Sequence, residues 1–418
     1  MVAGSARRLL AAGLFRTTPQ NLWNLCNPCS KWRKDHHTVL AMMRTVRGMQ
    51  SRRDRLAAIL VILPSIVLLA IFVYGFIAQT LRVSMTDWGR EAALAFNPEI
   101  RYIGLGNYRE LFTGFLNMRF RQDLANMFFF TLAFVGLSLL VGLLLATLID
   151  QLAWGETFFR TVFLYPMSLS LVVTGTIWRW LLQPRGGINV LPTLIGLPAG
   201  KFLWLSSRDQ SLVFDWSHIP YYILVIALVV MALMAYGHWR RGERRQLRIK
   251  SVISLVLIAI LAGGFAKRIG LLAYPEEHGF NKAIWGVVMA SVWQMSGYTM
   301  ALYLAGLRTI PDELREAARV DGAGKFQIYR YVDLPLLKPI TVSAIVVLGH
   351  IALKIFDLIF AMAGPDHVPT SVPAITMFLK TFRGNELAVG SAIGVILLIL
   401  VSLLIIPYLV SSFKTGEQ

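Results

Sequence analysis

Runs of about twenty apolar residues recur along the chain, and polar or charged stretches separate them. A helix of that length crosses the hydrocarbon core of a bilayer. The pattern predicts eight membrane spans, all of them helical because backbone groups in lipid must pair within the span. The predicted spans are residues 56–80, 124–149, 161–182, 219–236, 251–265, 283–307, 340–363 and 390–412.

The segments between the spans differ in charge and in turn-forming residues. Arg52, Arg53 and Arg55 precede the first span, which predicts a cytoplasmic N-terminus, and eight spans return the C-terminus to the same side. Residues 81–123 carry charges of both signs, and residues 183–218 are rich in Pro and Gly, so both are predicted as external loops. Residues 364–388 are predicted as an external link.

The fourth and fifth spans enclose a basic loop. Residues 238–250 hold six Arg or Lys against one Glu, which predicts a cytoplasmic position. The fifth span is short, and Lys267 and Arg268 follow it; their long side chains can snorkel to the interface. Residues 219–265 are therefore predicted as an inserted transmembrane hairpin. Two roles stay open for it, packing on the outside of the bundle and binding lipid through its basic loop.

Composition supports a membrane protein. The chain is 56% hydrophobic and 15% charged, a balance that would leave a soluble domain with too much exposed apolar surface. The formal charge of +18 does not indicate nucleic-acid binding, because the basic residues are spread over the N-terminus, one internal loop and the helix ends rather than gathered in one patch.

Residues 1–50 form a basic tail with a single acid, Asp35. The tail is predicted to be disordered or to follow from a misassigned start codon, since several Met residues precede the first span. Cys26 and Cys29, with His36 and His37, supply four nominal zinc ligands. A zinc module needs two well-spaced pairs in a foldable segment, so we expect no metal site and no cofactor.

The polar segment between the predicted spans 283–307 and 340–363 has the sequence signals of two short helices. Pro311, with Asp312 and Glu313 behind it, marks a helix N-terminus. Gly322 allows the chain to turn, and Leu334-Pro335 is predicted to stop the second helix. Residues 308–339 are therefore predicted as a cytoplasmic helix–turn–helix.

This segment matches a family pattern: Glu-Ala-Ala, three residues, Gly, nine residues, a β-branched aliphatic residue, one residue, Leu-Pro. Val332 stands where the family usually has Ile. The chain resembles the permease subunit of an ABC importer, of the carbohydrate-uptake, maltose-permease-like branch. The resemblance implies that the loop docks into a separate ATPase. The residues that it implicates in ATPase coupling are Glu316, Ala317, Ala318, Asp321, Gly322, Ala323, Leu334 and Pro335.

The resemblance also implies an organisation and a set of partners. Residues 55–218 and 282–415 form the six-span family core, and the hairpin 219–265 is extra. The expected function is that of a transmembrane permease subunit of an ATP-driven sugar importer in a bacterial or archaeal cell (inner) membrane. The expected partners are ATP-binding ABC subunits, a second permease subunit, an extracytoplasmic sugar-binding protein and membrane lipid, with no nucleic acid.

The chain is not expected to be an enzyme. It has no Gly-x-x-x-x-Gly-Lys-Ser/Thr phosphate loop, and Gly324-Lys325 is followed by Phe326. ATP hydrolysis therefore falls to partner subunits. The alternative function is an ion-coupled secondary transporter of a polar solute, in which Lys354 and Asp357 act as a relay. A membrane-embedded enzyme is disfavoured because no catalytic cluster is found.

Ionisable side chains inside a span are the first candidates for a substrate path. His350, Lys354 and Asp357 lie at i, i+4 and i+7 of one predicted helix and therefore share a face. Such a stripe suits the hydroxyl groups of a sugar. The alternative is that Lys354 pairs with Asp357 while His350 makes a helix–helix contact. Phe356-Asp357 resembles a recurrent pair of sugar permeases, although Gly364-Pro365 replaces the family's Gly-Gly-Pro.

The preceding span supplies three further candidates, Trp293, Gln294 and Tyr298. Gln294 and Tyr298 are spaced i, i+4 and share a face. Aromatic rings stack on the C–H faces of pyranose rings, and a nearby amide can bond their hydroxyl groups. The alternative is packing within the bundle together with an aromatic belt at the interface.

Overall fold

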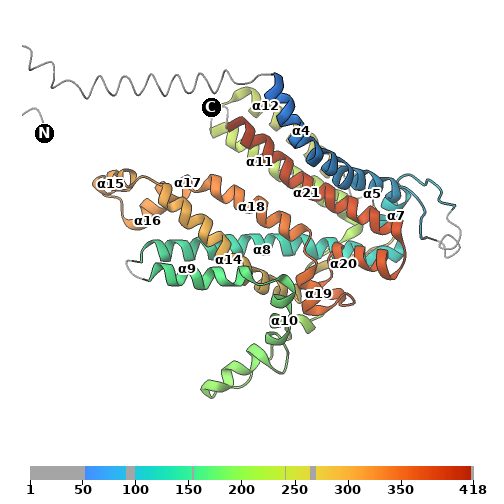
Figure 1. Ribbon diagram of the computed structural model, residues 1–418, viewed down its shortest axis with the longest axis horizontal. Helices are drawn as coiled ribbons and strands as arrows, with labels where there is room; N and C mark the ends of the chain where they lie inside the picture. Colours follow the sequence, from blue (N-terminus) through green and yellow to red (C-terminus); the bar gives the residue numbers. More distant parts are fainter. Residues whose placement is uncertain (1–51, 91–98, 153–154, 241, 264–269, 416–418) are drawn as a thin grey trace, which may run out of the picture. The chain divides into compact units, whose positions relative to one another are not determined.

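The computed structural model describes residues 52–90, 99–152, 155–240, 242–263 and 270–415 of the 418 (Figure 1). The predicted basic tail and its Cys-x-x-Cys lie outside these residues. Helices dominate the described part, with two short strands as well. The chain forms two compact units, Met1–Ala78 and Gln79–Gln418, which are described separately.

One long helix begins in the first unit and ends a few residues into the second. Helix α4 (Arg52–Leu69) continues through a π-helical turn, η2 (Ala70–Gly75), into α5 (Phe76–Ser84). The stretch Ile59–Ser84 is long and apolar enough to cross a membrane, and its apolar side chains are exposed. The first predicted span is therefore helical throughout.

The second unit is built around α8 (Met118–Asp150) and α14 (Ile284–Thr309), which pack along each other (Figure 1). A Cβ atom at Gly142 of α8 would overlap Thr299 of α14, so a small residue is needed at this contact. The Thr299 hydroxyl also donates to the Ser138 carbonyl oxygen over 2.8 Å. Close backbone approach thus fixes the two central helices together.

Helices α18 (Lys338–Leu353) and α21 (Leu387–Thr415) complete the long elements of the core. These two helices contact each other, and α18 also contacts α8 and α14. One main apolar core joins α8, α14 and the C-terminal helices, and a second cluster around Met300 and Tyr303 lies toward the end of α14.

Two of the predicted spans are not single helices. The third bends by 99° between Glu156–Ser168 and α10 (Leu171–Leu181). Before the bend, α9 (Glu156–Leu164) passes into a 3₁₀ turn, η4 (Tyr165–Ser168), which contains Pro166. After the bend, the Ser170 hydroxyl caps the start of α10 by accepting a hydrogen bond from the Val173 N–H over 3.2 Å.

The predicted span 340–363 is likewise wrong as one helix. Helix α18 ends at Leu353, and α19 (Asp357–Ala363) begins after three intervening residues. The intervening Phe356 has φ −138° and ψ −62°, outside helical geometry. A further 61° bend separates Lys325–Leu336 from α18.

Within the described residues, four helices are long and apolar enough to cross a membrane, or six if each bent pair is one span. The all-helical membrane fold is confirmed, whereas the count of eight stays a prediction. Helix α14 is not among these six, although more than half of its residues are buried. Its polar residues, such as Gln294 and Thr299, are buried within the protein and lower its apolar content.

The inserted segment is a helical hairpin, α11 (Ile219–Arg240) and α12 (Arg244–Ala262), whose helices pack on each other. A two-stranded antiparallel ribbon closes its base, with β1 (Gln210–Asp215) pairing with β2 (Glu277–Asn281). Strand β1 lies within the predicted irregular loop 183–218, so that loop is more ordered than its Pro and Gly content predicts.

Short elements also occupy the other predicted loops. They include α7 (Gly106–Thr113), η3 (Phe115–Asn117), η5 (Gly187–Ile195), η6 (Trp204–Ser206), η7 (Trp216–His218), η9 (Val368–Thr370), α20 (Pro373–Phe378) and η10 (Leu379–Arg383). The predicted helix–turn–helix consists of α15 (Asp312–Val320), α16 (Lys325–Ile328), η8 (Tyr329–Asp333) and α17 (Leu334–Leu336).

Candidate functional site

A cavity of about 360 Å³ lies where the two broken spans meet α8 and α14. Helix α10 packs against α19, so the bend before α10 and the break before α19 approach the same place. The residues lining the cavity are Phe134, Leu171, Ser291, Gln294, Met295, His350, Ile351, Lys354, Ile355, Phe356 and Asp357. Irregular backbone at membrane depth is tolerated where it lines a cavity, and broken helices commonly surround transport sites.

The structure brings four of the six predicted path residues to this cavity: Gln294, His350, Lys354 and Asp357. The reason differs from the predicted one, because Lys354 ends α18 and Asp357 starts α19, so the three ionisable residues do not share one helix face. The predicted alternative of a Lys354–Asp357 ion pair is not seen, since neither residue forms an ion pair within the described part of the chain.

Gln294 lines the cavity and has one side-chain acceptor without a partner in the described part of the chain. Its side chain is 2% exposed, and its Nε2 donates to the Leu169 carbonyl oxygen over 2.9 Å. That carbonyl belongs to the bend before α10. The Gln294 Oε1 is buried and has no hydrogen-bond partner among the described residues. A buried acceptor without a partner is costly, and a solute hydroxyl in the cavity would satisfy it.

The structure does not bring Trp293 and Tyr298 to the lining of this cavity. Trp293 packs edge-to-face on Trp178, with ring centroids 5.9 Å apart. Tyr298 packs half-buried against the main apolar core. Both contacts correspond to the packing alternative raised by the sequence.

The predicted coupling segment has a well-defined turn after α15. Gly322 has φ +83°, a left-handed conformation that favours glycine. The Gly322 N–H donates to Arg319 O over 3.0 Å, and the Ala323 N–H donates to Ala318 O over 2.9 Å. This pair of bonds is the Schellman termination of a helix. The predicted break at Gly322 is confirmed.

The predicted stop at Leu334-Pro335 lies within one residue of the observed helix end, after which the chain bends by 61° into α18. The helical chain passes through both residues and ends at Leu336. The π-helical turn η8, which precedes them, changes the backbone bonding pattern just where Pro335 lacks a donor. The predicted coupling residues therefore lie on two connected helical stretches, α15 with its turn and the η8–α17 segment.

Arg315 holds these two stretches together, a role that the sequence did not reveal. Its Nε donates to Asp333 Oδ1 over 3.0 Å, and an Nη donates to the Leu307 carbonyl oxygen over 3.4 Å. Asp333 is 7% exposed. Arg315 thus links α15 to η8 and to the last turns of α14. The i to i+18 spacing of Arg315 and Asp333 carries no periodic signal that would identify the pair.

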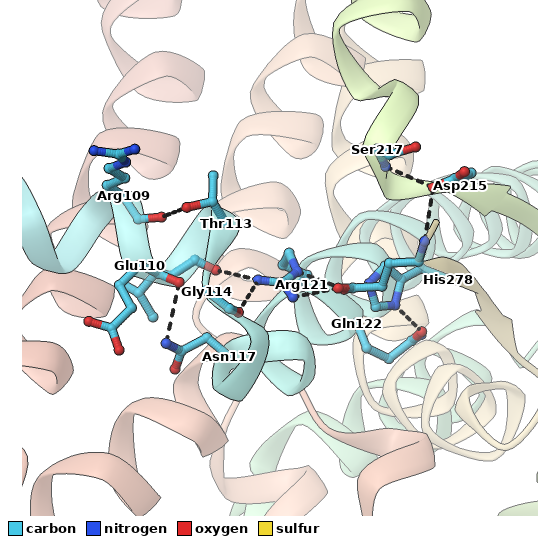
Figure 2. A network of polar contacts seen from close by, with 12 residues as sticks. Arg109, Glu110, Thr113, Gly114, Asn117, Arg121, Gln122, Asp215, Ser217 and His278 are labelled. Carbon is cyan, nitrogen blue, oxygen red and sulfur yellow. Dashed lines mark hydrogen bonds and ion pairs between the residues drawn. The ribbon is translucent and has the colours of Figure 1, made fainter. Parts of the chain in front are cut away.

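A buried polar network lies at the opposite end of α14, near the start of α8. Arg121 binds Glu276 through two bonds, of 2.6 and 2.5 Å, and donates to the Gly114 carbonyl oxygen over 2.8 Å (Figure 2). His278 contacts Glu276 through Nε2 and Gln122 Oε1 through Nδ1 over 2.9 Å. The network joins α8 to the ribbon below the inserted hairpin.

The network sets the protonation of its members. Burial alone would raise the pKa of Glu276, but the hydrogen bonds and charges of Arg121 and His278 lower it below the ordinary value. Burial lowers the pKa of His278, with Glu276 opposing that shift. The stable arrangement is an ionised Glu276 bound to Arg121 beside a neutral His278.

Comparison with known proteins decides the family. The model of the binding-protein-dependent transport system inner membrane component matches residues 193–415. A probable ABC transporter permease protein of Pyrococcus horikoshii is 32% identical over 362 residues, which cover 86% of this chain and 97% of the relative. The chain belongs to this family of permeases. The predicted resemblance to ABC importer permeases is confirmed, and the permease is a multi-pass membrane protein.

Two further proteins are similar to this permease. A xylose/arabinose import permease protein of Haloferax volcanii is 30% identical over 353 residues, 84% of this chain and 86% of the relative. The solved structure of a bacterial ABC transporter involved in the import of the acidic polysaccharide alginate has a TM-score of 0.52 at 20% identity, covering 86% of this chain and 96% of that chain. The latter supports the fold.

Proposed function

We propose that this permease subunit forms the translocation path of an ATP-driven sugar importer. The observation that carries the proposal is the cavity at the two broken spans, which Gln294, Lys354 and Asp357 line together and where the buried Gln294 Oε1 has no partner among the described residues. Its volume, about 360 Å³, lies at the lower end of the range of small-molecule sites. The sugar cargo of the Haloferax relative gives independent support for the substrate class.

The lining suits a sugar chemically. Gln294 supplies an acceptor, Lys354 donors and Asp357 further acceptors, while Phe134 and Leu171 supply apolar walls. A pyranose presents hydroxyl groups at its edge and C–H groups on its faces, and therefore matches both kinds of wall. Charges inside a membrane protein are costly unless solute, solvent or a partner meets them. Lys354 and Asp357 are exposed in this chain, as such contacts require.

The coupling segment supports dependence on a separate ATPase. We propose that residues 308–339 dock on ATP-binding subunits in the cytoplasm, which places both chain termini on that side. The sequence holds no phosphate-binding loop, so hydrolysis is assigned to those partners. A second permease subunit completes the path, and an extracytoplasmic sugar-binding protein delivers the solute.

The Arg315 contacts suggest how motion reaches the path. Because Arg315 ties α15 to both η8 and α14, displacement of the docked segment by an ATPase would move the end of α14 with it. Helix α14 carries Gln294 into the cavity. Alternation between outward and inward openings needs such a bistable bundle, biased by the ATPase at one end.

The test is to purify the chain in mild detergent with its associated subunits and to measure ATP hydrolysis against a panel of sugars. The expected result is co-purification of an ATPase and a second permease, with hydrolysis stimulated by one sugar and its binding protein. A chain that never retains an ATPase, even after gentle extraction, would contradict the proposal.

A further inference from the structure

The tip of the inserted hairpin concentrates positive charge. Its basic residues within the described part of the chain occupy the end of α11 and the first two turns of α12. They are Arg240, Arg244, Arg245, Arg248 and Lys250. Arg244, Arg245 and Arg248 are exposed and form no ion pair with any described residue. Here these five residues are called the basic collar.

The only acid in the collar's stretch of sequence is Glu243, and it is already occupied. His238 Nδ1 lies 2.8 Å from Glu243 Oε2. The five cations of the basic collar therefore outnumber the one carboxylate of this stretch, which leaves the tip strongly positive. Moreover, Arg244 and Arg245 stand in the first turn of α12, which holds no acid. Cations there oppose the helix dipole, so helix stability does not account for them.

Aromatic residues next to the basic collar indicate its depth in a bilayer. Tyr236 and Trp239 are 50% and 63% exposed, with ring centroids 5.8 Å apart, and the Arg240 guanidinium lies 5.0 Å from the Tyr236 ring centre. Exposed Tyr and Trp at the end of a span are typical of the headgroup level of a bilayer. Lys250 Nζ lies 3.7 Å from Met234 Sδ. The collar thus extends about two helical turns down the hairpin, roughly the depth of a headgroup layer.

Below the collar, the hairpin presents lipid-compatible surface. No residue of α11 is buried within the protein, and α11 and α12 run side by side (Figure 1). Exposed apolar residues on α11 and α12 include Ile226, Leu233, Val252 and Leu255. Lipid chains therefore fit the walls of the hairpin, and the collar lies where their headgroups begin.

The collar belongs to the cytoplasmic leaflet, an assignment that rests on the proposed function. Strand β2 leads directly into the start of α14, and the coupling segment follows the end of α14, so the ribbon is on the external side. Helix α11 leaves the ribbon and has 22 residues, about 33 Å. That length crosses the hydrocarbon core, which puts the tip on the side of the coupling segment.

We propose that the basic collar of the inserted hairpin binds the headgroups of anionic phospholipids in the cytoplasmic leaflet. Each cation near an anionic membrane surface strengthens attraction by about 1 kcal/mol, which is about fivefold in binding. Several exposed arginines on one tip therefore give a marked preference for anionic over zwitterionic lipid.

The test compares lipids retained by the purified full-length chain. Protein is equilibrated in detergent with equal amounts of phosphatidylglycerol and phosphatidylcholine, and the bound lipids are counted by native mass spectrometry. The expected result is enrichment of phosphatidylglycerol that falls at least tenfold in the triple variant Arg244→Gln/Arg245→Gln/Arg248→Gln. Raising the salt concentration should weaken the enrichment in the unaltered protein.

The control removes the same charge from the external loop, by Arg185→Gln/Lys201→Gln/Arg208→Gln, and should keep the enrichment. A second variant, Arg244→Lys/Arg245→Lys/Arg248→Lys, keeps the charge of the collar and should therefore also keep the enrichment of phosphatidylglycerol. Equal enrichment in the triple Gln variant and the unaltered protein would overturn the proposal. So would a variant that loses a bound ATPase while keeping its lipids, since the collar would then contact protein. The lipid count needs no ATP, so it can fail while the importer function stands.

Discussion

At the scale of single residues, Gln294 joins two parts of the cavity wall. Its Nε2 donates a hydrogen bond to the carbonyl oxygen of Leu169, which lies in the bend between η4 and α10. Its Oε1 has no hydrogen-bond partner among the described residues. One side chain therefore supports a broken span and keeps one acceptor that the proposed solute would satisfy. Such an unpaired buried group has a cost, which binding would remove.

Replacing Gln294 by Met keeps the length of the side chain and removes both polar ends. We expect the sugar concentration for half-maximal transport to rise about two- to thirteenfold, the effect of one lost hydrogen bond of about 0.5–1.5 kcal/mol. Uptake in vesicles measures it. Tyr298→Phe, one turn further along α14, is the matched control and should leave uptake unchanged. Equal loss in both variants would contradict a solute contact at Gln294.

Gly322 offers a second test at residue scale, on the coupling turn. No atom lies within 4 Å of the place where a Cβ would stand, so a substitution there acts through the backbone alone. Gly322→Val must adopt φ near +83°, which costs at least about 1–2 kcal/mol, whereas Asn tolerates that region. We expect Gly322→Val to reduce co-purification of the ATPase and Gly322→Asn to retain most of it. Normal co-purification with Val would refute a role for this turn in docking.

At the scale of elements, the sequence predicted which segments are helical but not where they break. Apolar runs predicted the spans, and Gly322 predicted its turn, because each signal is local. Pro166 lies just before the break at Leu169, but the break at Lys354–Phe356 contains neither Pro nor Gly and has no such signal. Gln294 was found for its polarity, but its pairing with Leu169 spans 125 residues and could not be predicted.

The link between α15 and η8 gives a prediction about coupling. Arg315→Met removes a charged hydrogen bond to the buried Asp333, at a cost of about 2 kcal/mol. We expect sugar transported per ATP hydrolysed to fall while ATPase binding persists. Arg319→Met, one turn away and without an ion pair in the described chain, is the control. Unchanged stoichiometry in Arg315→Met would show that the link transmits no motion.

The Arg121–Glu276–His278 network gives a prediction about pH. The pKa of His278 is below its ordinary value of 6.5, so the unfolded chain binds more protons below that pH and stability falls on acidification. Half-buried His367, whose pKa is lowered by burial, adds to this decline. The lowered pKa of Glu276 adds a loss only below about pH 4.5.

Thermal unfolding between pH 7.5 and pH 5 tests this. We expect the melting temperature to fall below about pH 6.5, and to fall less steeply in His278→Asn, which cannot take up a proton. His238→Asn, at the exposed tip of the hairpin, should follow the unaltered protein. Parallel curves for all three proteins would show that His278 does not control acid stability.

At the scale of the whole molecule, the cavity and the coupling segment are linked by α14. The residues after its C-terminal end hold the segment proposed to meet an ATPase, its middle lines the cavity, and the ribbon and buried network precede its N-terminal end. The buried network suits a fixed support at the end of α14 remote from the coupling segment, the external end in the proposed orientation. Movement imposed at the cytoplasmic end would then change the cavity.

The most direct test of this account is sugar uptake into vesicles that contain the permease with its partner subunits and binding protein. ATP is supplied on the side of the membrane that the ATPase faces, and no ion gradient is imposed. We expect uptake under these conditions, and we expect it to stop when ATP is withheld or when Gly322→Val is introduced. Uptake that needs an imposed proton or sodium gradient, and proceeds at full rate without ATP, would contradict it.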